Sequence, residues 1–563
     1  MKTKQHFKFL FATLISTQLV ACNDSKDQQT NAAETAKSPN VLFIMADDLG
    51  YSDLGAFGGE IHTPNLDALA TQGRIFTDYH TAPTCSPTRS QLISGTDHHL
   101  AGIGAMAELT PDNFKGQPGY EGYLNNRSLS IAEVLKDNGY HTYMAGKWHL
   151  GLTAETNAAA RGFERSFTLL QGLDLHFKQN PSQYNRAAQS TYTEDGKVIP
   201  ISDLPDDFYS SNYYADKIIH YIDSNRNDGK PFFAYAAFTA PHWPLQAPAE
   251  YSDRYKGKYD AGYDVIRNAR LERQKQLGII PADFKAANPV TTASAPQQYG
   301  HWNELTADQK AIEARKMEVY AGMVENLDAN IGRIISYLKA NKLYDNTLIF
   351  FVSDNGAEGF IRGQYGASQG FDNSLKNIGT SSSYQFIGPR WAEVSETPFH
   401  LWKDTAGEGA TSVPAIVKLP NQSQSAPTYR GFASVLDVFP TVLQFAGITV
   451  PEKQYHGREI NTPSGVSWKN LLENKNSSIR AEDFIFADEL HASKYVKSGE
   501  WKIAHQGKSN LANGTEQWEL YNLKNDRGET TNLATLYPEK VQALAKLYQK
   551  YAQANGVLEY PQR

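Results

Sequence analysis

Cysteine is scarce in this chain, whose 563 residues include only Cys22 and Cys85. A framework of several disulfides is therefore excluded, and burial of apolar side chains has to stabilise the fold. Clusters of lysine and arginine are missing as well: the formal net charge is -7, and no basic stretch is interleaved with aromatic residues. Nucleic acid is accordingly not an expected partner. Because neither cysteine belongs to a disulfide framework, each of them needs an explanation of its own.

No apolar run is long enough for a typical membrane-spanning helix, and the most conspicuous one lies at the start. Lys2, Lys4 and Lys8 come before the apolar stretch 9–20, which is too short to span a bilayer comfortably and is typical of a signal peptide. The residues Leu19-Val20-Ala21-Cys22 look like a bacterial lipobox, which predicts cleavage before Cys22 and lipidation of its thiol. An ordinary signal peptide with an incidental cysteine is the alternative.

Three consecutive regions are expected at the N-terminus. Residues 1–21 form the signal peptide, and residues 22–39, which are polar and lack an apolar period, form a flexible tether. The folded part then begins near Asn40. This arrangement predicts a lipoprotein of the bacterial periplasm, anchored to the membrane through a lipid on Cys22.

Strand-like and helix-like segments alternate along the rest of the chain. Short apolar runs typical of buried strands occupy residues 40–45, 140–145, 231–238 and 347–352. Helical segments are expected at residues 65–73, 130–138 and 311–341. Such alternation predicts an α/β fold with a largely parallel central sheet. Residues 162–210 and 251–300 show little periodicity, and we expect them to form long loops at the rim of a pocket.

Polar side chains follow the expected strands directly. Asp47 and Asp48, then His242, then Asp354 and Asn355 each come just after an apolar run, and ligands of open α/β sheets bind at that edge. Without a cation, carboxylates packed together would repel one another and raise one another's pKa values. An oxygen-only set of ligands fits calcium or magnesium rather than zinc. For a single aspartate in this position, a turn or a helix cap is the alternative.

Cys85 begins the run Cys85-Ser86-Pro87-Thr88-Arg89. Pro87 and the helix-compatible stretch after it place Cys85 at a helix N-terminus, where free backbone amides attract anions. Arg89 adds a fixed cation whose forked donors suit a tetrahedral oxyanion. The pattern predicts an anion site, and a cysteine packed in the core is the alternative.

Other lysines and histidines stand in motifs that suit the same chemistry. In Lys147-Trp148-His149 an extended backbone would direct the two outer side chains to the same side. His242 lies between two prolines, in a loop suited to protonating a leaving oxygen. Lys403 follows Leu401-Trp402. For each of these residues alone, an exposed lysine or a packed histidine is the alternative.

Taken together, the motifs resemble the type I sulfatases, and bacterial arylsulfatases in particular. The run at 85–89 is similar to their first signature, C-x-P-x-R, and residues 139–151 look like their second. In that family a formylglycine-generating or sulfatase-maturating enzyme oxidises the cysteine to formylglycine (3-oxoalanine), and a hydroxyl of the hydrated aldehyde attacks sulfur. The chain departs from the usual pattern at Thr88 and Ser94, which are hydroxyl-for-hydroxyl changes, and at Ala410, where a second glycine is usual.

The resemblance implies two groups of site residues. The catalytic group is Cys85, Arg89, Lys147, His149, His242 and Lys403. The ligands of one calcium ion are Asp47, Asp48, Cys85, Asp354 and Asn355.

The resemblance extends from about Asn40 into the C-terminal region. It implies an alkaline-phosphatase-like α/β sandwich, with a large, mostly parallel mixed sheet, over residues 40–449, and a smaller α+β subdomain with an antiparallel sheet over residues 450–563. The expected elements of that subdomain are strands at 484–490, 495–505 and 518–523 and a helix at 538–554.

The activity that the resemblance implies is hydrolysis of a sulfate ester, with release of inorganic sulfate and an alcohol or phenol. Two alternatives stay open. The same site would accept tetrahedral phosphorus, as in a phosphomonoester or phosphonate monoester hydrolase. The chain could also be a non-catalytic lipoprotein that binds sulfated glycans. The natural ester, whether aryl sulfate, polysaccharide or small metabolite, is not fixed by the sequence.

Overall fold

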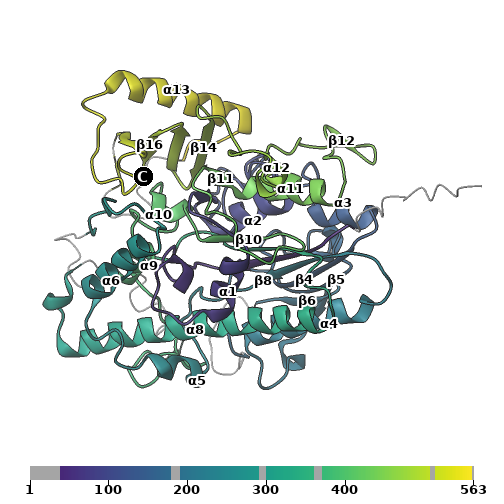
Figure 1. Cartoon of the computed structure of the whole chain (residues 1–563), viewed down its shortest axis with the longest axis horizontal. Coiled ribbons are helices and arrows are strands. Elements are labelled where there is room, and N and C mark those ends of the chain that lie inside the picture. Colours follow the sequence, from purple (N-terminus) through teal and green to yellow (C-terminus); the bar gives the residue numbers. More distant parts are fainter. Residues whose placement is uncertain are drawn as a thin grey trace, which may run out of the picture. The chain divides into compact units, whose positions relative to one another are not determined.

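A nine-stranded sheet forms the centre of the fold (Figure 1). The structure is a computed structural model that describes residues 38–178, 190–290, 300–360, 370–507, 514–515 and 517–560. The expected signal peptide and all but the last two residues of the expected tether lie outside these ranges. Within them, every helix is too short or too polar to cross a bilayer.

The sheet has the order β2-β10-β9-β1-β8-β4-β5-β6-β7. Its parallel strands are β9 (Thr347–Ser353), β1 (Asn40–Ala46), β8 (Phe232–Ala237), β4 (His141–Lys147) and β5 (Arg165–Leu169). Antiparallel strands complete both edges, namely β10 (Ala415–Lys418), β2 (Arg74–Phe76), β6 (Tyr192–Glu194) and β7 (Lys197–Ile199). The sheet is therefore mixed and mostly parallel, as expected.

Helices cover both faces of this sheet (Figure 1). One layer contains α1 (Pro64–Gln72), α4 (Ser210–Asn225) and α8 (Ala307–Ala340), and the other contains α2 (Cys85–Ser94), α3 (Ile131–Asp137) and α11 (Val438–Phe445). Alternate residues of β1 enter the two cores: Leu42 and Ile44 pack in the first, and Val41 and Phe43 in the second. Every residue of β1 is buried, as a strand covered on both faces requires. The predicted α/β class is confirmed.

The regions that were expected to be long loops contain regular structure. Residues 162–210 include β5 and the short strands β6 and β7, and residues 251–300 include α6 (Tyr263–Gln276). The expectation of long loops was wrong: β6 and β7 span three residues each, which is too short for a periodic pattern, and the 14-residue helix α6 was missed. The place of these regions at a pocket rim stays a prediction. Shorter elements elsewhere are β3 (Tyr79–His80), β11 (Ala433–Ser434), β12 (Gln454–Tyr455), β13 (Arg458–Glu459), α5 (Ala249–Ser252), α9 (Pro389–Ser395), α10 (Glu408–Thr411) and α12 (Lys469–Leu472).

A second, antiparallel sheet lies near the C-terminus. It consists of β14 (Ile485–Leu490), β15 (Ser493–Ser498), β16 (Trp501–His505) and β17 (Glu519–Asn522), and α13 (Pro538–Asn555) packs on it. The single strand expected at 495–505 is in fact two, because Gly499 turns the chain with φ 56°. Both sheets belong to one compact unit, Ser38–Arg563, and the boundary at residues 449 and 450 stays a prediction.

Candidate active site

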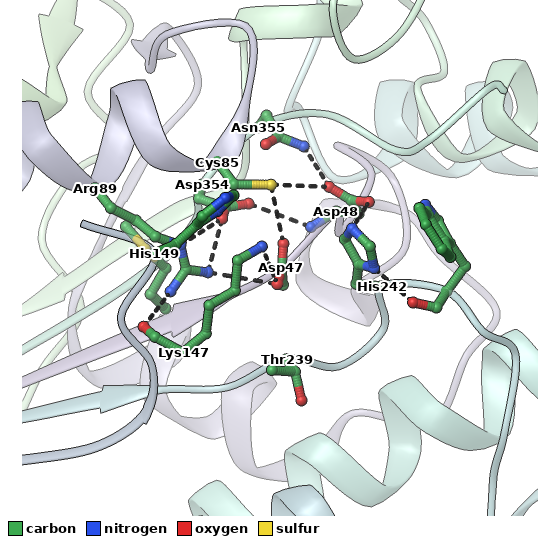
Figure 2. Close-up of polar contacts among 12 residues, drawn as sticks. Asp47, Asp48, Cys85, Arg89, Lys147, His149, Thr239, His242, Asp354 and Asn355 are labelled. Atoms are coloured by element: carbon green, nitrogen blue, oxygen red, sulfur yellow. Dashed lines mark hydrogen bonds and ion pairs between the residues drawn. The ribbon is translucent and has the colours of Figure 1, made fainter. Parts of the chain in front are cut away.

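The candidate site lies at the carboxyl ends of the central strands (Figure 2). Asp47 and Asp48 follow β1, and Asp354 and Asn355 follow β9. The parallel register pairs Ala46 with Ser353, so the two polar pairs leave the sheet side by side. The Asp48 backbone N–H donates to Asp354 Oδ1 at 3.3 Å.

Cys85 is the first residue of α2 and is buried against the two aspartates that follow β1. Its Sγ lies 3.4 Å from Asp47 Oδ1 and 3.9 Å from Asp48 Oδ1. Burial, followed by the charge of Asp354, raises the pKa of the Cys85 thiol well above its ordinary value. In this environment the unmodified side chain is a protonated thiol and a poor nucleophile.

Cations lie on the Asp47 side of this sulfur. Lys147 Nζ donates to Asp47 Oδ2 at 2.8 Å, and Arg89 donates to Asp354 Oδ2 through Nε at 2.9 Å and Nη2 at 2.7 Å. Burial opposes ionisation of Asp47, but the charges of Lys147, His242 and Arg89 outweigh it and lower the pKa of Asp47. Burial and the charge of Asp47 raise the pKa of Asp354 to about 6, against the effect of Arg89.

A second group lies on the Asp48 side. Lys403 Nζ donates to both carboxylate oxygens of Asp48, at 2.8 and 3.0 Å, and His242 Nε2 lies 3.5 Å from Asp48 Oδ2. His242 Nδ1 is 2.6 Å from the Trp243 carbonyl oxygen, which can only accept, so Nδ1 carries a proton and Nε2 faces the site. Burial lowers the pKa of His242 to about 3, although Asp48 opposes that shift.

The oxygens of this site fit a hard divalent cation. The carboxylates of Asp47, Asp48 and Asp354 are buried, and ligand atoms of Asp47, Asp48, Cys85 and His242 lie within 4.8 Å of one another. Asn355 donates to Asp48 Oδ1 at 2.6 Å, whereas its own Oδ1 is buried and has no hydrogen-bond partner among the described residues. An unsatisfied buried oxygen beside several carboxylates is the arrangement that a calcium ion would complete.

The backbone conformation of His149 differs from the extended one that was expected. The strand β4 ends at Lys147, and His149 has a left-handed backbone with φ 56°, so strand alternation does not place its side chain. Its ring is buried and lies next to Arg89 in the view of Figure 2. The ring Nε2 is 3.1 Å from Glu108 Oε1.

Sequence reasoning missed two acidic residues that contact the site. Glu108 is one of them, and no pattern around it marks it. The other, Glu358, lies 3.5 Å from Lys403 Nζ through Oε2 and accepts a hydrogen bond from Trp243 Nε1. Its place in the same post-strand segment as Asn355 was the signal available for it.

A family profile described as Sulfatase matches residues 39–448. The chain belongs to the sulfatase family. It is accordingly a hydrolase of sulfuric esters, as the family resemblance in the sequence implied.

Two relatives of this sulfatase cover most of its length. An uncharacterized sulfatase of Schizosaccharomyces pombe is 42% identical over 544 residues, which are 94% of this chain and 96% of the relative. An arylsulfatase of Klebsiella aerogenes is 39% identical over 457 residues, 80% of this chain and 95% of the relative. Among solved structures, the fold is similar to the crystal structure of Ps i-CgsB in complex with k-i-k-neocarrahexaose, with a TM-score of 0.63 and 23% sequence identity. The match covers 92% of this chain and 94% of the Ps i-CgsB chain. That similarity shows a shared fold.

Proposed function

We propose that this sulfatase cleaves aryl sulfates and related esters with a formylglycine formed from Cys85. The observation that carries the proposal is the position of the Cys85 sulfur, 3.4 Å from Asp47 and at the N-terminus of α2. A thiol buried between two aspartates is poorly placed to act as a thiolate. An oxygen-bearing side chain at the same position would instead join the surrounding carboxylates as a ligand of a cation. When hydrated, oxidised residue 85 supplies one hydroxyl that attacks sulfur and a second whose deprotonation expels sulfate.

The cations around residue 85 would hold the sulfate group. Lys147 contacts Asp47 and Lys403 contacts Asp48, so their Nζ atoms can donate to different sulfate oxygens. Arg89 holds Asp354 in place through two hydrogen bonds, and Asp354 can accept a proton from the attacking hydroxyl. Charge stabilisation by groups fixed in advance is usually the largest contribution to catalysis.

The groups proposed to transfer a proton to the leaving oxygen are the two that contact Asp48. His242 presents Nε2 to this carboxylate, and Lys403 Nζ is within hydrogen-bonding distance of Asp48. We assign the protonation of the departing alcohol or phenol to His242 together with Lys403: Asp48 keeps Lys403 protonated, and His242 Nε2 can relay that proton to the leaving oxygen. His149, on the other side of the site, takes the proton of the second hydroxyl when sulfate is released.

Asp47, Asp48, Asp354, Asn355 and residue 85 would hold one calcium ion. The ion would stabilise negative charge on the attacking hydroxyl and on the sulfate oxygens. The buried Asn355 Oδ1, which has no partner in the described part of the chain, supports this assignment.

The substrate class is tested with matched aryl esters. On protein whose oxidation at residue 85 has been verified, we expect kcat/KM for 4-nitrophenyl sulfate to exceed kcat/KM for 4-nitrophenyl phosphate. A preference for phosphate would favour the phosphomonoesterase alternative. Turnover of neither ester, followed by no turnover of a panel of sulfated glycans, would favour a binding protein. The name of the Klebsiella relative makes aryl sulfates the first choice of assay.

Export and anchoring are proposed on the N-terminal sequence alone. We propose that residues 1–21 direct the chain to a bacterial periplasm and that a lipid on Cys22 holds it at the membrane. Substitution of Cys22 by alanine should move the protein from the membrane fraction to the soluble fraction. Unchanged fractionation would contradict lipidation at this position.

A further inference from the structure

Glu108 and His149 form a hydrogen-bonded pair at the edge of the candidate site. Glu108 lies in the short helical turn Ala107–Leu109, and its Oε1 and Oε2 are 3.1 and 3.3 Å from His149 Nε2. The His149 side chain is 5% exposed, whereas that of Glu108 is 49% exposed. The carboxylate therefore meets solvent on one side and a buried imidazole on the other.

The backbone and a neighbouring glycine fix the orientation of the His149 ring. The His149 N–H donates to the Leu170 carbonyl at 3.2 Å. Gly172 lies against the ring so closely that a β-carbon there would be 2.5 Å from His149 Cε1 and 2.7 Å from Nε2. Rotation of the imidazole about its Cβ–Cγ bond is thus hindered, and Nε2 stays directed at Glu108.

The hydrogen bond also decides which ring nitrogen carries the proton. An ionised carboxylate can only accept, so His149 Nε2 must donate, and in the neutral ring Nδ1 is then an unprotonated acceptor. Nδ1 is buried and has no hydrogen-bond partner among the described residues. Burial lowers the pKa of His149, and Glu108 opposes that shift, which is consistent with a neutral ring.

We propose that Glu108 is a positioning residue for sulfate release: it holds His149 in the tautomer whose Nδ1 can accept a proton from residue 85. This inference rests on the proposed function. The proton of the second hydroxyl moves to Nδ1, and the O–H electron pair becomes the second bond of the restored carbonyl. The C–O bond to sulfate breaks, and its electron pair leaves on sulfate. The Glu108 carboxylate then stabilises the imidazolium through the same hydrogen bond, as the aspartate does in a Ser-His-Asp triad.

The inference predicts a particular kinetic defect in Glu108→Gln. Glutamine keeps the length of the side chain but can also donate to Nε2, which favours the wrong tautomer. Release of sulfate should slow by about 10- to 100-fold. This decrease is smaller than the one expected when the general base itself is removed. Cleavage of the ester comes earlier and does not use His149 as a base. We therefore expect kcat and KM to fall together, kcat/KM to stay within about twofold, and alcohol release to outpace sulfate release in the first turnover.

The control variants separate this defect from a general disturbance of the segment. Glu108→Asp retains the carboxylate and should recover part of kcat. Asp112→Asn removes an exposed acid of the same segment, which pairs with Lys115, and should leave all constants unchanged. In a His149→Ala background, Glu108→Gln should have no additional effect, because the two residues act as a unit.

Rapid-quench measurement of alcohol and sulfate release is the test, with ¹⁵N spectra of the His149 ring as a readout that needs no activity. Burst release of alcohol by Glu108→Gln, with a lowered KM, supports the inference. An unchanged kcat in Glu108→Gln, or a raised KM without a burst, overturns the positioning role of Glu108. As long as the oxidised wild type turns over, the proposed function is not affected by that result. If the oxidised wild type shows no turnover, the proposed function fails. The spectra then decide: Nε2–H in the wild type and a tautomer mixture in Glu108→Gln support the positioning role, and identical spectra refute it.

Discussion

Lys403 Nζ contacts both carboxylate oxygens of Asp48, at 2.8 and 3.0 Å. Both side chains are buried, so the ion pair holds a fixed positive charge at the edge of the cluster that contains Cys85. Burial opposes the charge on Lys403, but Asp48 raises its pKa well above the ordinary value. A permanent cation beside a proposed sulfate site is the kind of preorganised group that stabilises a transition state.

Removal of this charge should reduce the rate of the reaction. We expect Lys403→Met to lower kcat for an aryl sulfate by about 100- to 1,000-fold. The matched control is Lys418→Met, since Lys418 is also a buried lysine but lies in β10 opposite Ile349, toward the amino end of β9. Steady-state kinetics of both variants provide the check, and equal losses of kcat would show that the defect comes from burial rather than from the site.

Residue 85 should be essential to turnover and dispensable for folding. Cys85→Ala leaves only the β-carbon of residue 85, and the loss of so small a buried group costs about 1 kcal/mol. We therefore expect turnover to fall to the uncatalysed background, with circular dichroism unchanged and Tm lowered by a few degrees at most. A variant that is folded and as active as the wild type would rule out residue 85 as the nucleophile.

Calcium should stabilise the folded protein, and Asn355 should contribute to its affinity. A chelator should lower both activity and Tm, and added calcium should restore them, because a ligand of the native state alone stabilises it by mass action. Asn355→Ala removes the unpartnered Oδ1 and should weaken calcium binding by about tenfold, or about 1.4 kcal/mol.

The measurement for Asn355 is Tm as a function of free calcium. Asn138→Ala serves as control, since Asn138 caps α3 through the Val134 carbonyl and contacts none of the proposed ligands. It should shift Tm at every calcium concentration by the same amount. A calcium dependence in Asn355→Ala identical to that of the wild type would contradict ligation by this residue.

Stability should depend on pH through His99. Its Nδ1 is 3.1 Å from Asp97 Oδ1 and its Nε2 is 3.2 Å from Glu489 Oε2. Burial alone would lower the pKa of His99, but hydrogen bonds and charge from Asp97 and Glu489 raise it from 6.5 to about 10. Since the folded-state pKa exceeds the unfolded value, this stabilisation is fully present below the unfolded pKa and is lost as pH rises through about 10.

Substitution of His99 tests this dependence. His99→Gln should lower the free energy of unfolding by about 3 kcal/mol near pH 6, because it breaks a buried ion pair. The difference from the wild type should shrink as pH approaches 10. Urea denaturation across that range is the measurement, with His456→Gln as an exposed control. A difference that stays constant with pH would refute the contribution of a charged His99.

Much of the site follows from local sequence patterns. Asp47, Asp48, Asp354 and Asn355 were placed correctly at strand ends because β1 and β9 are buried on both faces and give continuous apolar runs. Cys85 was placed at the start of a helix because Pro87 fits the first turn.

Local sequence patterns could not predict contacts between residues that are far apart in the sequence. Glu108 and His149 are 41 residues apart, and an acidic residue in a loop carries no sign of its partner. The hairpin of β6 and β7 was missed because β7 is partly exposed and has no periodic pattern. Strand alternation was expected to direct Lys147 and His149 to the same side. In the structure, the left-handed backbone at His149 determines where its ring lies.

Peptide mass spectrometry of residue 85 in fully active enzyme shows whether the nucleophile is a formylglycine. We predict an aldehyde at this position, with an occupancy that rises in proportion to specific activity across preparations. An unmodified thiol in fully active enzyme would contradict it.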